Sequence, residues 1–505
     1  MVLAVEGVSI FGATGTFTEC NFSGNKQGAV LLIASSGTIT NCTFNGNTTL
    51  LGGSAVQLVG SSVAITGCTM NGNTASIQGG AVSLGNASGT ITNCTISGNT
   101  SPNGGGIAIN ATTGTATLAI TSCTVANNTG TNNGGIFVQS TGTGTIAVTL
   151  RNTIIANNGS LNIGGSAAPG SFATVTSQGF NLTNDLTNVS LNQPTDIVNA
   201  NPLLGPLQNN GGPTQTHALL VGSPAIDKGL SSGTSADQRG VTRPLNDAAL
   251  PNATGGDGAD IGAFERSLPA VVSASSYKPG ALAQESIVAA FGETLTVGTA
   301  SATAVPLPTT LDSTSVFVLD AQNTERPAPL FFVSPGQLNF QIPPGTAVGN
   351  ATVFVRRSGT AVASTSITIA AIEPSLFTAN SSGAGVPAAF LVRVKANNTQ
   401  VNEPVAIFQG GVFVPAPISL GPVGESLILV LYGTGIRNRS ALSAVTLNIG
   451  GTTLGVDFAG IAPGFIGLDQ VNSVAVPRTL IGKGTVTVTL TVDGKPTNTV
   501  TLNFQ

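Results

Sequence analysis

The residues with the types that could do nucleophilic chemistry lie in the stretch NPLLGPLQNNGGPTQTHALLVGSPAIDKG (201–229). His217 is the one histidine of the chain, and Ser223 and Asp227 follow it. A serine, a histidine and an aspartate form the set used by many hydrolases, but no nucleophile-elbow motif accompanies them and nothing in their spacing brings them together. We therefore expect His217 to be a structural loop histidine and predict no catalytic residue.

A second candidate is a calcium loop. The stretch GGDGADIGA (255–263) matches much of the calcium-binding nonapeptide GGxGxDxUx, but Gly262 stands where a large apolar residue belongs. Loops of that kind bind calcium in tandem copies, and the motif occurs once here. The sequence predicts no metal site and no cofactor.

Acidic and basic residues return together in DQRGVTRP (237–244) and DIGAFE (260–265). Because an arginine can fork onto a carboxylate, we expect Arg239 and Arg243 to pair with Asp237, Asp260 or Glu265.

The five cysteines have a regular spacing. They lie at Cys20, Cys42, Cys68, Cys94 and Cys123, which are 22, 26, 26 and 29 residues apart. Their number is odd and no histidine or carboxylate accompanies them, so a disulfide framework or a metal site is disfavoured. The pattern predicts a ladder of small apolar thiols inside a repeating structure.

Each cysteine belongs to a repeated phrase, and the last copy places Asn152 in the slot 29 residues after Cys123. A period of this length carried by strands predicts a β-solenoid. The copies are FTECNFSGN (17–25), ITNCTFNGN (39–47), ITGCTMNGN (65–73), ITNCTISGN (91–99), ITSCTVANN (120–128) and LRNTIIANN (150–158).

Within one copy, Ile91, Cys94 and Ile96 should face inward around a kink at Asn93, with Thr92 and Thr95 facing outward. Stacked coils align like residues in ladders. We expect an outward threonine ladder at Thr40, Thr66, Thr92, Thr121 and Thr149. We expect amides bonded along the stack at Asn47, Asn73, Asn99 and Asn128, and glycine corners at Gly79-Gly80, Gly104-Gly105-Gly106 and Gly134-Gly135.

These motifs carry a resemblance. FNGN (44–47) and GGAV (79–82) resemble the FxxN and GGA[ILV] repeats of polymorphic outer-membrane proteins and related bacterial right-handed parallel β-helix surface proteins. The similarity covers about residues 1–195 and implies a right-handed parallel β-helix. The segment 196–268 resembles the part of such proteins that precedes a surface-anchoring module, which implies a cap closing the last coil.

No Asp, Glu, Lys, Arg or His occurs between Lys26 and Arg151. Polysaccharide lyases and glycosidases need carboxylates or a basic residue to move protons, so the coils are predicted to be non-catalytic. Regular threonines also occur in ice-binding solenoids, and Thr38-Ile39-Thr40 and Thr90-Ile91-Thr92 fit that pattern. Ala64 and Ala119 break the first column, so we expect a solvated face and keep ice binding as an alternative.

The C-terminal half contains alternating strands of another kind. TVTVTLTVDGKPTNTVTL (485–502) predicts a hairpin with Asp493-Gly494 at its turn, and NATVFVRRSGTAVASTSITI (350–369) and SLILVLYGTGI (426–436) are similar runs. We predict two Ig-like β-sandwiches, residues 269–378 and 379–505, after the β-helix, so the fold class is all-β. Glu373, Asp457 and Asp469 are expected to be loop or surface carboxylates.

Segments of this half also resemble an acidobacterial-type C-terminal domain of unknown function on secreted proteins. They are VVSASSYKPGALAQESIVAAFG (271–292), APLFFVSPGQLNFQIPPG (328–345) and FAGIAPGFIGLDQVNSVAVP (458–477). The resemblance implies an extracellular or cell-surface location, although the sequence shows no signal peptide.

The amino-acid composition and the net charge limit the classes of partner. Of 505 residues only 8% are charged and the net charge is −4, which argues against nucleic acid, and no apolar run is long enough to span a membrane. We expect a non-catalytic extracellular structural or adhesive protein. An open β edge near Met1 predicts head-to-tail self-association into a filament, through the β-helix ends or the sandwiches. The alternative is a carbohydrate-binding or carbohydrate-cleaving protein with surface glycans as partners, although the chain has no Trp and two Tyr.

Overall fold

The computed structural model describes residues 7–185, 190–220, 222–247, 250–293 and 295–505. Within these ranges every regular element is a strand except the 3-10 turns η1 (Leu442–Ala444) and η2 (Arg478–Leu480), which confirms the all-β prediction. The chain divides into two compact units, Met1–Ser267 and Leu268–Gln505.

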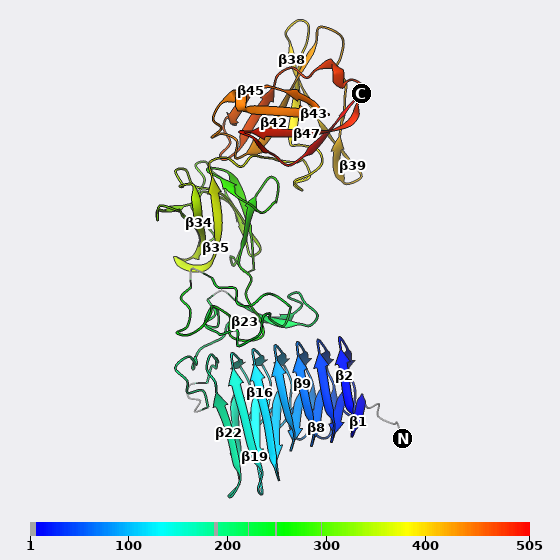
Figure 1. Ribbon diagram of the computed structural model, residues 1–505, viewed down its shortest axis with the longest axis vertical. Coiled ribbons are helices and arrows are strands. Elements are labelled where there is room, and N and C mark those ends of the chain that lie inside the picture. The colour runs from blue at the N-terminus through cyan, green and yellow to red at the C-terminus, as the bar shows by residue number, and fades with distance from the viewer. Residues whose placement is uncertain (1–6, 186–189, 221, 248–249, 294) are drawn as a thin grey trace. The chain divides into compact units, whose positions relative to one another are not determined.

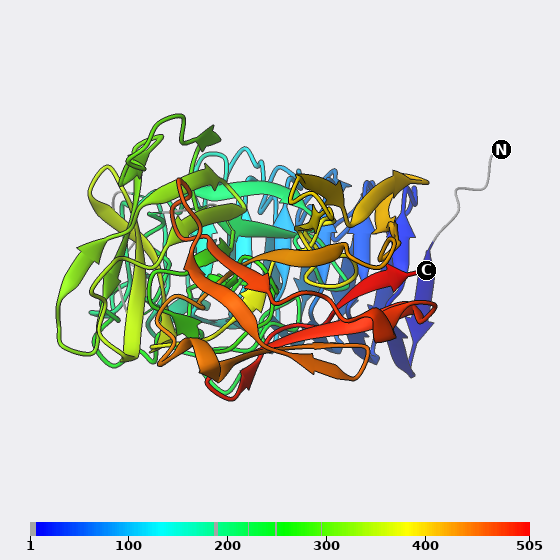
Figure 2. The ribbon, with the colours of Figure 1, turned by 90° about the horizontal axis from the view of Figure 1, so that it is seen from above.

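The first unit contains a solenoid of three parallel sheets, seen as repeated arrows from blue to cyan in Figures 1 and 2. The first sheet holds β1 (Val8–Phe11), β4 (Val30–Ile33), β8 (Val56–Val59), β12 (Val82–Gly85), β15 (Ile107–Ala111), β18 (Ile136–Ser140) and β21 (Ile163–Ala167). The second holds β2 (Thr14–Thr18), β5 (Ser36–Thr40), β9 (Ser62–Thr66), β13 (Ser88–Thr92), β16 (Thr115–Thr121), β19 (Thr145–Arg151) and β22 (Phe172–Ser177). The third holds β3 (Asn21–Ser23), β6 (Thr43–Asn45), β10 (Thr69–Asn71), β14 (Thr95–Ser97), β17 (Thr124–Ala126) and β20 (Ile154–Ala156), beside the short pair β7 (Thr48–Thr49) and β11 (Thr74–Ala75).

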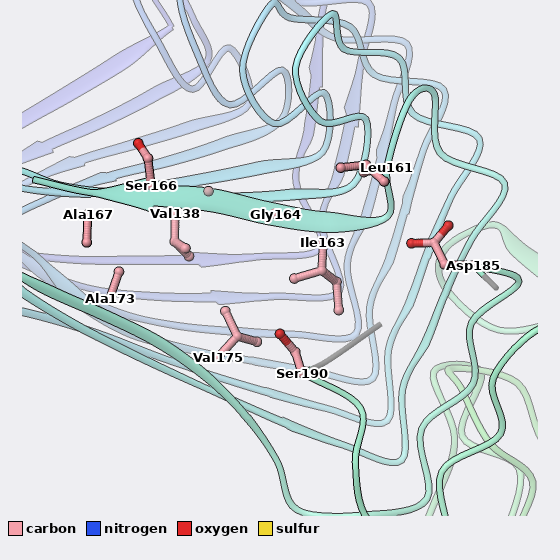
Figure 3. Close-up of a pocket in the computed structure, with 11 residues that line it drawn as sticks. Val138, Leu161, Ile163, Gly164, Ser166, Ala167, Ala173, Val175, Asp185 and Ser190 are labelled. Carbon is pink, nitrogen blue, oxygen red and sulfur yellow. The ribbon is translucent and has the colours of Figure 1, made fainter. Parts of the chain in front are cut away.

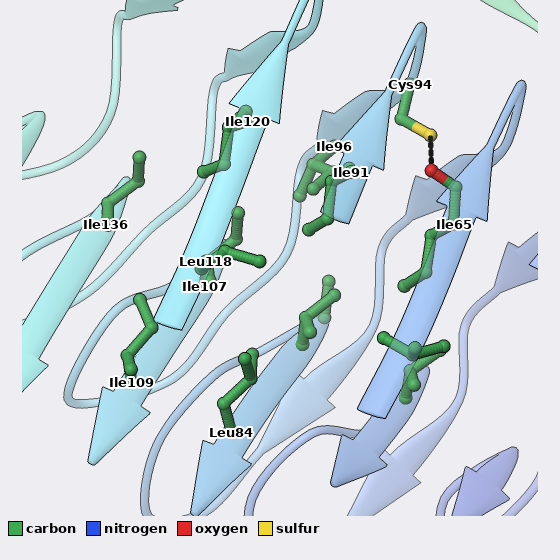
Figure 4. Packing of buried hydrophobic residues seen from close by; sticks show 14 of the residues in the cluster. Ile65, Leu84, Ile91, Cys94, Ile96, Ile107, Ile109, Leu118, Ile120 and Ile136 are labelled. Carbon is green, nitrogen blue, oxygen red and sulfur yellow. Dashed lines mark hydrogen bonds between the residues drawn. The ribbon is translucent and has the colours of Figure 1, made fainter. Parts of the chain in front are cut away.

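Inward-facing side chains of successive coils stack into one continuous apolar core. Ile39, Ile65, Ile91 and Ile120 are each fully buried, and they pair in register from strand to strand. Figure 4 shows Ile65, Ile91 and Ile120 on neighbouring strands of this core. The alternation of apolar and hydroxyl residues in each repeat therefore decides which face of the strand is inside.

The cysteine ladder was predicted correctly. Cys42, Cys68, Cys94 and Cys123 are fully buried, Cys20 in the first coil is partly exposed, and all five are free thiols. The backbone N–H of each cysteine from Cys20 to Cys68 donates to the sulfur of the next coil at 3.3 Å. The preceding residue has a positive φ, for example 53° at Asn41 and 49° at Asn93, which is the predicted kink.

Two predictions about the repeat were wrong. The slot after Cys123 is occupied by Thr153, whose Oγ1 accepts from the Cys123 N–H at 3.3 Å, because the last coil is one residue longer than the predicted offset. The outward ladder continues from Thr121 to Arg151, and Thr149 pairs with Ala119 instead.

A ladder of buried asparagines runs beside the cysteines, as predicted for Asn47, Asn73, Asn99 and Asn128. The Nδ2 of each donates to the Oδ1 of the next at 2.8 Å, and Asn128 donates in turn to Asn158 at 2.9 Å. Each Oδ1 also accepts the backbone N–H of the preceding asparagine at 3.0 Å. The amides therefore satisfy one another and the backbone at a buried turn.

The segment after the solenoid was expected to close its last coil. Leu182 does extend the stack by pairing with Ile154 and Ile197. The residues that follow also lie along the outward side of β10, β14 and β17, and they include the hairpin of β23 (Leu204–Gln208) and β24 (Thr216–Leu219). We call the described residues between 196 and 268 the covering segment. There the buried Gln238 accepts from Thr95 Oγ1 at 2.7 Å and donates to Thr69 Oγ1 at 2.9 Å. This lateral cover explains why these two outward threonines are buried.

The second unit begins with two sheets. The first holds β25 (Ala270–Ser273), β27 (Ile287–Phe291), β33 (Gln337–Gln341), β32 (Leu330–Ser334) and β28 (Ala300–Ser301). The second holds β26 (Leu282–Ala283), β35 (Thr360–Ala370), β34 (Gly349–Arg357), β30 (Thr314–Leu319), β29 (Thr310–Leu311) and β31 (Glu325–Pro327). Strands β34 and β35 form the hairpin that the alternation at 350–369 indicates.

Two further sheets and a separate hairpin follow. The first sheet holds β36 (Ser375–Leu376), β37 (Ala389–Val394), β38 (Gln400–Pro404), β42 (Ser426–Thr434), β45 (Val456–Ile461) and β46 (Asp469–Ser473). The second holds β41 (Pro417–Ile418), β43 (Val445–Ile449), β44 (Thr452–Leu454), β47 (Gly484–Val492), β48 (Lys495–Pro496) and β49 (Val500–Phe504), and the separate hairpin is β39 (Ala406–Gln409) with β40 (Val412–Pro415). These sheets are consistent with the predicted sandwiches. The boundaries predicted at 195, 268 and 378 stay predictions.

The predicted turn at Asp493-Gly494 is present, with φ of 48° and 80°, as a tight hairpin turn requires. One predicted surface carboxylate was misplaced. Asp469 lies on β46 with its side chain fully buried, and its Oδ1 accepts from Arg437 Nε at 2.7 Å. The partner is distant in sequence, so spacing gave no sign of it. Glu373 does lie at the surface, where Lys495 Nζ is 2.7 Å away.

Candidate functional site

The expected arginine–carboxylate pairs form, and they lie inside the segment that covers the solenoid. Arg239 Nε is 2.9 Å from Asp237 Oδ2, and the guanidinium lies 3.6 Å from the ring centre of Phe264. Arg243 Nε is 3.0 Å from Glu265 Oε2, and both of these side chains are fully buried. The planar guanidinium suits such contacts because it can stack and pair at once.

The neighbouring carboxylates are tied to backbone N–H groups. Asp260 Oδ1 accepts from the N–H of Asp227 at 2.8 Å, and Glu265 Oε2 accepts from the N–H of Asp260 at 3.0 Å. Asp227 in turn accepts from the N–H of Asp247 at 3.1 Å. The carboxylates therefore fix the path of a segment that has few strands of its own.

Burial changes the acidity of this cluster. It raises the pKa of Asp227 to about 7, and it raises the pKa values of Asp260 and Glu265, which also repel each other while Arg243 opposes the change. Perturbed carboxylates are a common sign of acid–base catalysis, but buried ion-pair networks have the same effect. Because Asp227 and Glu265 are 0% exposed, a substrate cannot reach them in this arrangement.

His217 lies on strand β24, so its predicted place in a loop was wrong. Its Nδ1 donates to the Gly205 carbonyl at 2.7 Å and its Nε2 accepts from Ser97 Oγ at 2.8 Å. Burial lowers the pKa of His217, which favours the neutral ring. The ring therefore fastens the covering segment to β14.

Ser223 and Asp227, which were considered as catalytic partners of His217, make other contacts. Ser223 Oγ donates to the Pro202 carbonyl at 2.5 Å, and Asp227 is held in the carboxylate cluster. No contact among the described residues joins the three side chains into a catalytic set.

The nonapeptide-like stretch uses its carboxylates for backbone contacts. Asp257 accepts from the N–H groups of Ser231 and Ala259, each at 3.1 Å, and Asp260 accepts from those of Asp227 and Arg266. Over the described ranges no group of three or more His, Cys, Asp or Glu side chains is placed to hold a metal ion. The described part of the chain also has no helix long and apolar enough to cross a membrane.

A pocket of about 380 Å³ opens beside the last coil of the solenoid (Figure 3). Its wall is formed by Val138, Ile163, Val175 and their neighbours, and its described ionisable lining residue is Asp185. Asp185 accepts from the backbone N–H of Asn162 at 3.1 Å and from its Nδ2 at 2.9 Å. A glycosidase needs a pair of carboxylates, so this lining does not supply that chemistry.

Sequence reasoning missed both Asp185 and Gln238 as organising residues. Each acts through contacts to a residue more than 20 positions away, so no local pattern marks it. The repeated asparagine position indicates that some acceptor must bind the last side-chain amide, but it does not identify the residue that supplies this acceptor.

No curated protein matches the chain. The family model described as "Right handed beta helix region" matches residues 6–191. The finer resemblances, to outer-membrane-protein repeats and to the acidobacterial C-terminal domain, stay predictions. The parallel registers of β1 to β22 and the family match agree, so the described solenoid is a right-handed parallel β-helix.

Proposed function

We propose that the protein is a non-catalytic extracellular protein with a structural or adhesive role. The observation that carries this proposal is the absence of any Asp, Glu, Lys, Arg or His between Lys26 and Arg151, over most of the β-helix. Hydroxyl and amide side chains can form a contact surface but cannot replace the carboxylates of a polysaccharide-cleaving site.

The charged residues beyond the coils support the same proposal. Those of the covering segment pair with one another or with backbone N–H groups, and Asp185 ends the asparagine ladder. Such side chains stabilise a scaffold, and their contacts would have to break before they could take part in a reaction.

Self-association is the form of structural role that the β-helix edge favours. In the described part of the chain, β1, β2 and β3 each have one hydrogen-bonded neighbour and lie at the edges of their sheets. Phe11 on β1 is 65% exposed, and Phe17 and Phe22 are only partly buried. A second copy of the chain can cover this apolar edge and extend the strand pairing.

Sedimentation and negative-stain imaging over a range of concentrations test this association. The full chain should form elongated assemblies, Phe11→Lys should shift them to monomers, and Leu50→Lys should leave them unchanged because Leu50 is similarly exposed but belongs to an inner coil, away from both edges of the solenoid. Dispersed monomers at high concentration would reject self-association.

A separate experiment tests the proposal that the protein is not a catalyst. Release of reducing ends from plant or bacterial polysaccharides by the full chain, abolished by Asp185→Asn, would replace the proposal with carbohydrate cleavage.

A further inference from the structure

The outward side of the second solenoid sheet is a regular array of hydroxyl groups. Its strands pair without a register shift, so outward residues form three columns across the coils, and Thr115, Thr145 and Phe172 add a short border column on the last three strands. The first column is Thr14, Ser36, Ser62, Ser88, Thr117, Ala147 and Thr174. The second is Thr16, Thr38, Ala64, Thr90, Ala119, Thr149 and Thr176, and the third is Thr18, Thr40, Thr66, Thr92, Thr121 and Arg151. We call these residues the hydroxyl array.

The threonine ladder predicted from the sequence at Thr40, Thr66, Thr92 and Thr121 is the third column, and Ala64 and Ala119 were expected to break the column beside it. The register confirms that both alanines lie in that column. It also places Thr149 there and sets an unbroken run of threonines, Thr18 to Thr121, beside it. The interruptions are therefore isolated small residues in an otherwise continuous face.

The array faces solvent, and its hydroxyls are available to a ligand. None of its members is buried, in contrast to Thr69 and Thr95, which lie under Gln238. Two hydrogen bonds involve its side chains in the described structure: Thr14 Oγ1 with Ser36 Oγ at 2.8 Å, and Thr174 Oγ1 with the Ile146 carbonyl at 3.2 Å.

The geometry of parallel strands gives the array two fixed repeats. Neighbouring strands lie about 4.8 Å apart, and alternate residues along a strand lie about 6.6 Å apart. Each threonine presents a methyl group beside a hydroxyl group, so apolar and hydrogen-bonding positions repeat over the whole face.

Charge is confined to the borders of the array. Glu19 follows Thr18 in the first coil, Arg151 ends the third column in the sixth coil, and the positions between them are uncharged. Charged groups hold water in their own hydration shells, whereas hydroxyls and methyls can fit into an ordered network of water molecules. An uncharged, repetitive surface therefore suits an uncharged, repetitive partner.

We propose that the hydroxyl array binds the surface of ice crystals. The hydroxyl groups take part in the surface hydrogen-bond network, and the methyl groups fill the spaces between its water molecules. A crystalline polysaccharide is the less favoured partner, because sugar-binding platforms use aromatic rings, whereas the three columns contain none and the border column has the single ring of Phe172. This binding is independent of self-association and of the absence of catalysis.

The test measures how the full chain partitions into slowly growing ice, together with the thermal hysteresis of its solution. The wild-type chain should enter the ice and shape its crystals. The double variant Thr66→Lys and Thr90→Lys places two charges at exposed positions in the centre of the array and should lose both effects. Ser76→Lys adds a charge at an exposed position outside the array and should keep them.

Thermal unfolding checks that the variants remain folded. Thr117→Lys, at another exposed position of the array, takes the place of the double variant if that chain unfolds. Exclusion of the wild-type chain from ice, or equal loss in Ser76→Lys, would overturn the proposal. Binding of the wild-type chain to cellulose or chitin crystals without partition into ice would also overturn it and assign the face to polysaccharide.

Discussion

The side-chain amide of Asn162 donates to Asp185 Oδ1 at 2.9 Å, and this contact ends the asparagine ladder that starts at Asn25. Every Nδ2 in the ladder points toward the following coil, so the donor ends of the amides point toward Asp185. A carboxylate has only acceptor atoms and accepts both N–H groups of Asn162. The Asn162 amide also donates to Thr183 Oγ1 and to Asn184 Oδ1, each at 2.8 Å, so three acceptors from one short segment end the ladder.

Replacing Asp185 by Ala should destabilise the β-helix. The substitution leaves the buried backbone N–H of Asn162 without its acceptor, which costs about 1 kcal/mol of unfolding free energy, while the side-chain amide keeps Thr183 Oγ1 and Asn184 Oδ1 as acceptors. Asp185→Asn keeps one acceptor oxygen and should cost less. Calorimetric unfolding of the full chain measures both values, and an unchanged transition for Asp185→Ala would contradict this role.

The sequence was sufficient to predict the coil but not its surroundings. The phrase around Cys94 defines the inward residues, the kink at Asn93 and the amide slot at Asn99, because each depends only on alternation and a fixed period. The positions of Gln238, Asp185 and Asp469 depend on contacts between distant segments, which a repeat does not encode. The slip from Asn152 to Thr153 has a different cause: the aligned phrase LRNTIIANN (150–158) has Thr153 at the cysteine position, but the fixed offset of 29 residues does not allow for a change in coil length.

The thiols should differ sharply in reactivity. Burial raises the pKa of the Cys94 thiol, and Cys42, Cys68 and Cys123 are equally shielded from solvent, whereas Cys20 is partly exposed. Because the thiolate is the reactive form and needs access, a soluble alkylating reagent should modify Cys20 first in the native chain. Mass spectrometry of the digested protein identifies the modified residue. Rapid native labelling of Cys94 would show that the ladder opens.

The covering segment should lose stability as the pH rises. The pKa of Asp227 is about 7 in the folded chain and about 4 for an ordinary aspartate, so the unfolded chain releases this proton at lower pH. The stability from the protonated form is complete below about pH 4 and is lost as the pH rises through about 7, with a loss of at most about 4 kcal/mol from this group.

The variant Asp227→Asn removes this titration and keeps an oxygen that can accept from the Asp247 N–H. Its unfolding free energy should depend less on pH than that of the wild-type chain between about pH 4 and pH 8. Calorimetry resolves the first unit, and tyrosine fluorescence follows the second unit, which contains both Tyr277 and Tyr432. Equal slopes in the two chains would show that Asp227 does not titrate in this range.

The buried pair Arg437 and Asp469 should be worth more to stability than an exposed pair in the same unit. Asp469 Oδ2 also accepts from the N–H of Ile436 at 2.7 Å, and Arg437 Nη1 lies 3.2 Å from Glu285 Oε2, so the arginine contacts a residue of each predicted sandwich region. Arg437→Gln leaves a buried carboxylate without its charged partner, which should cost about 3 kcal/mol. The control is Arg356→Gln, which breaks the ion pair between Arg356 and Glu325. These side chains are 27% and 35% exposed, respectively, so the loss should be at most about 1 kcal/mol of unfolding free energy. Denaturant unfolding followed by tyrosine fluorescence compares the two variants, and equal losses would mean that Asp469 is protonated or hydrated once the arginine is gone.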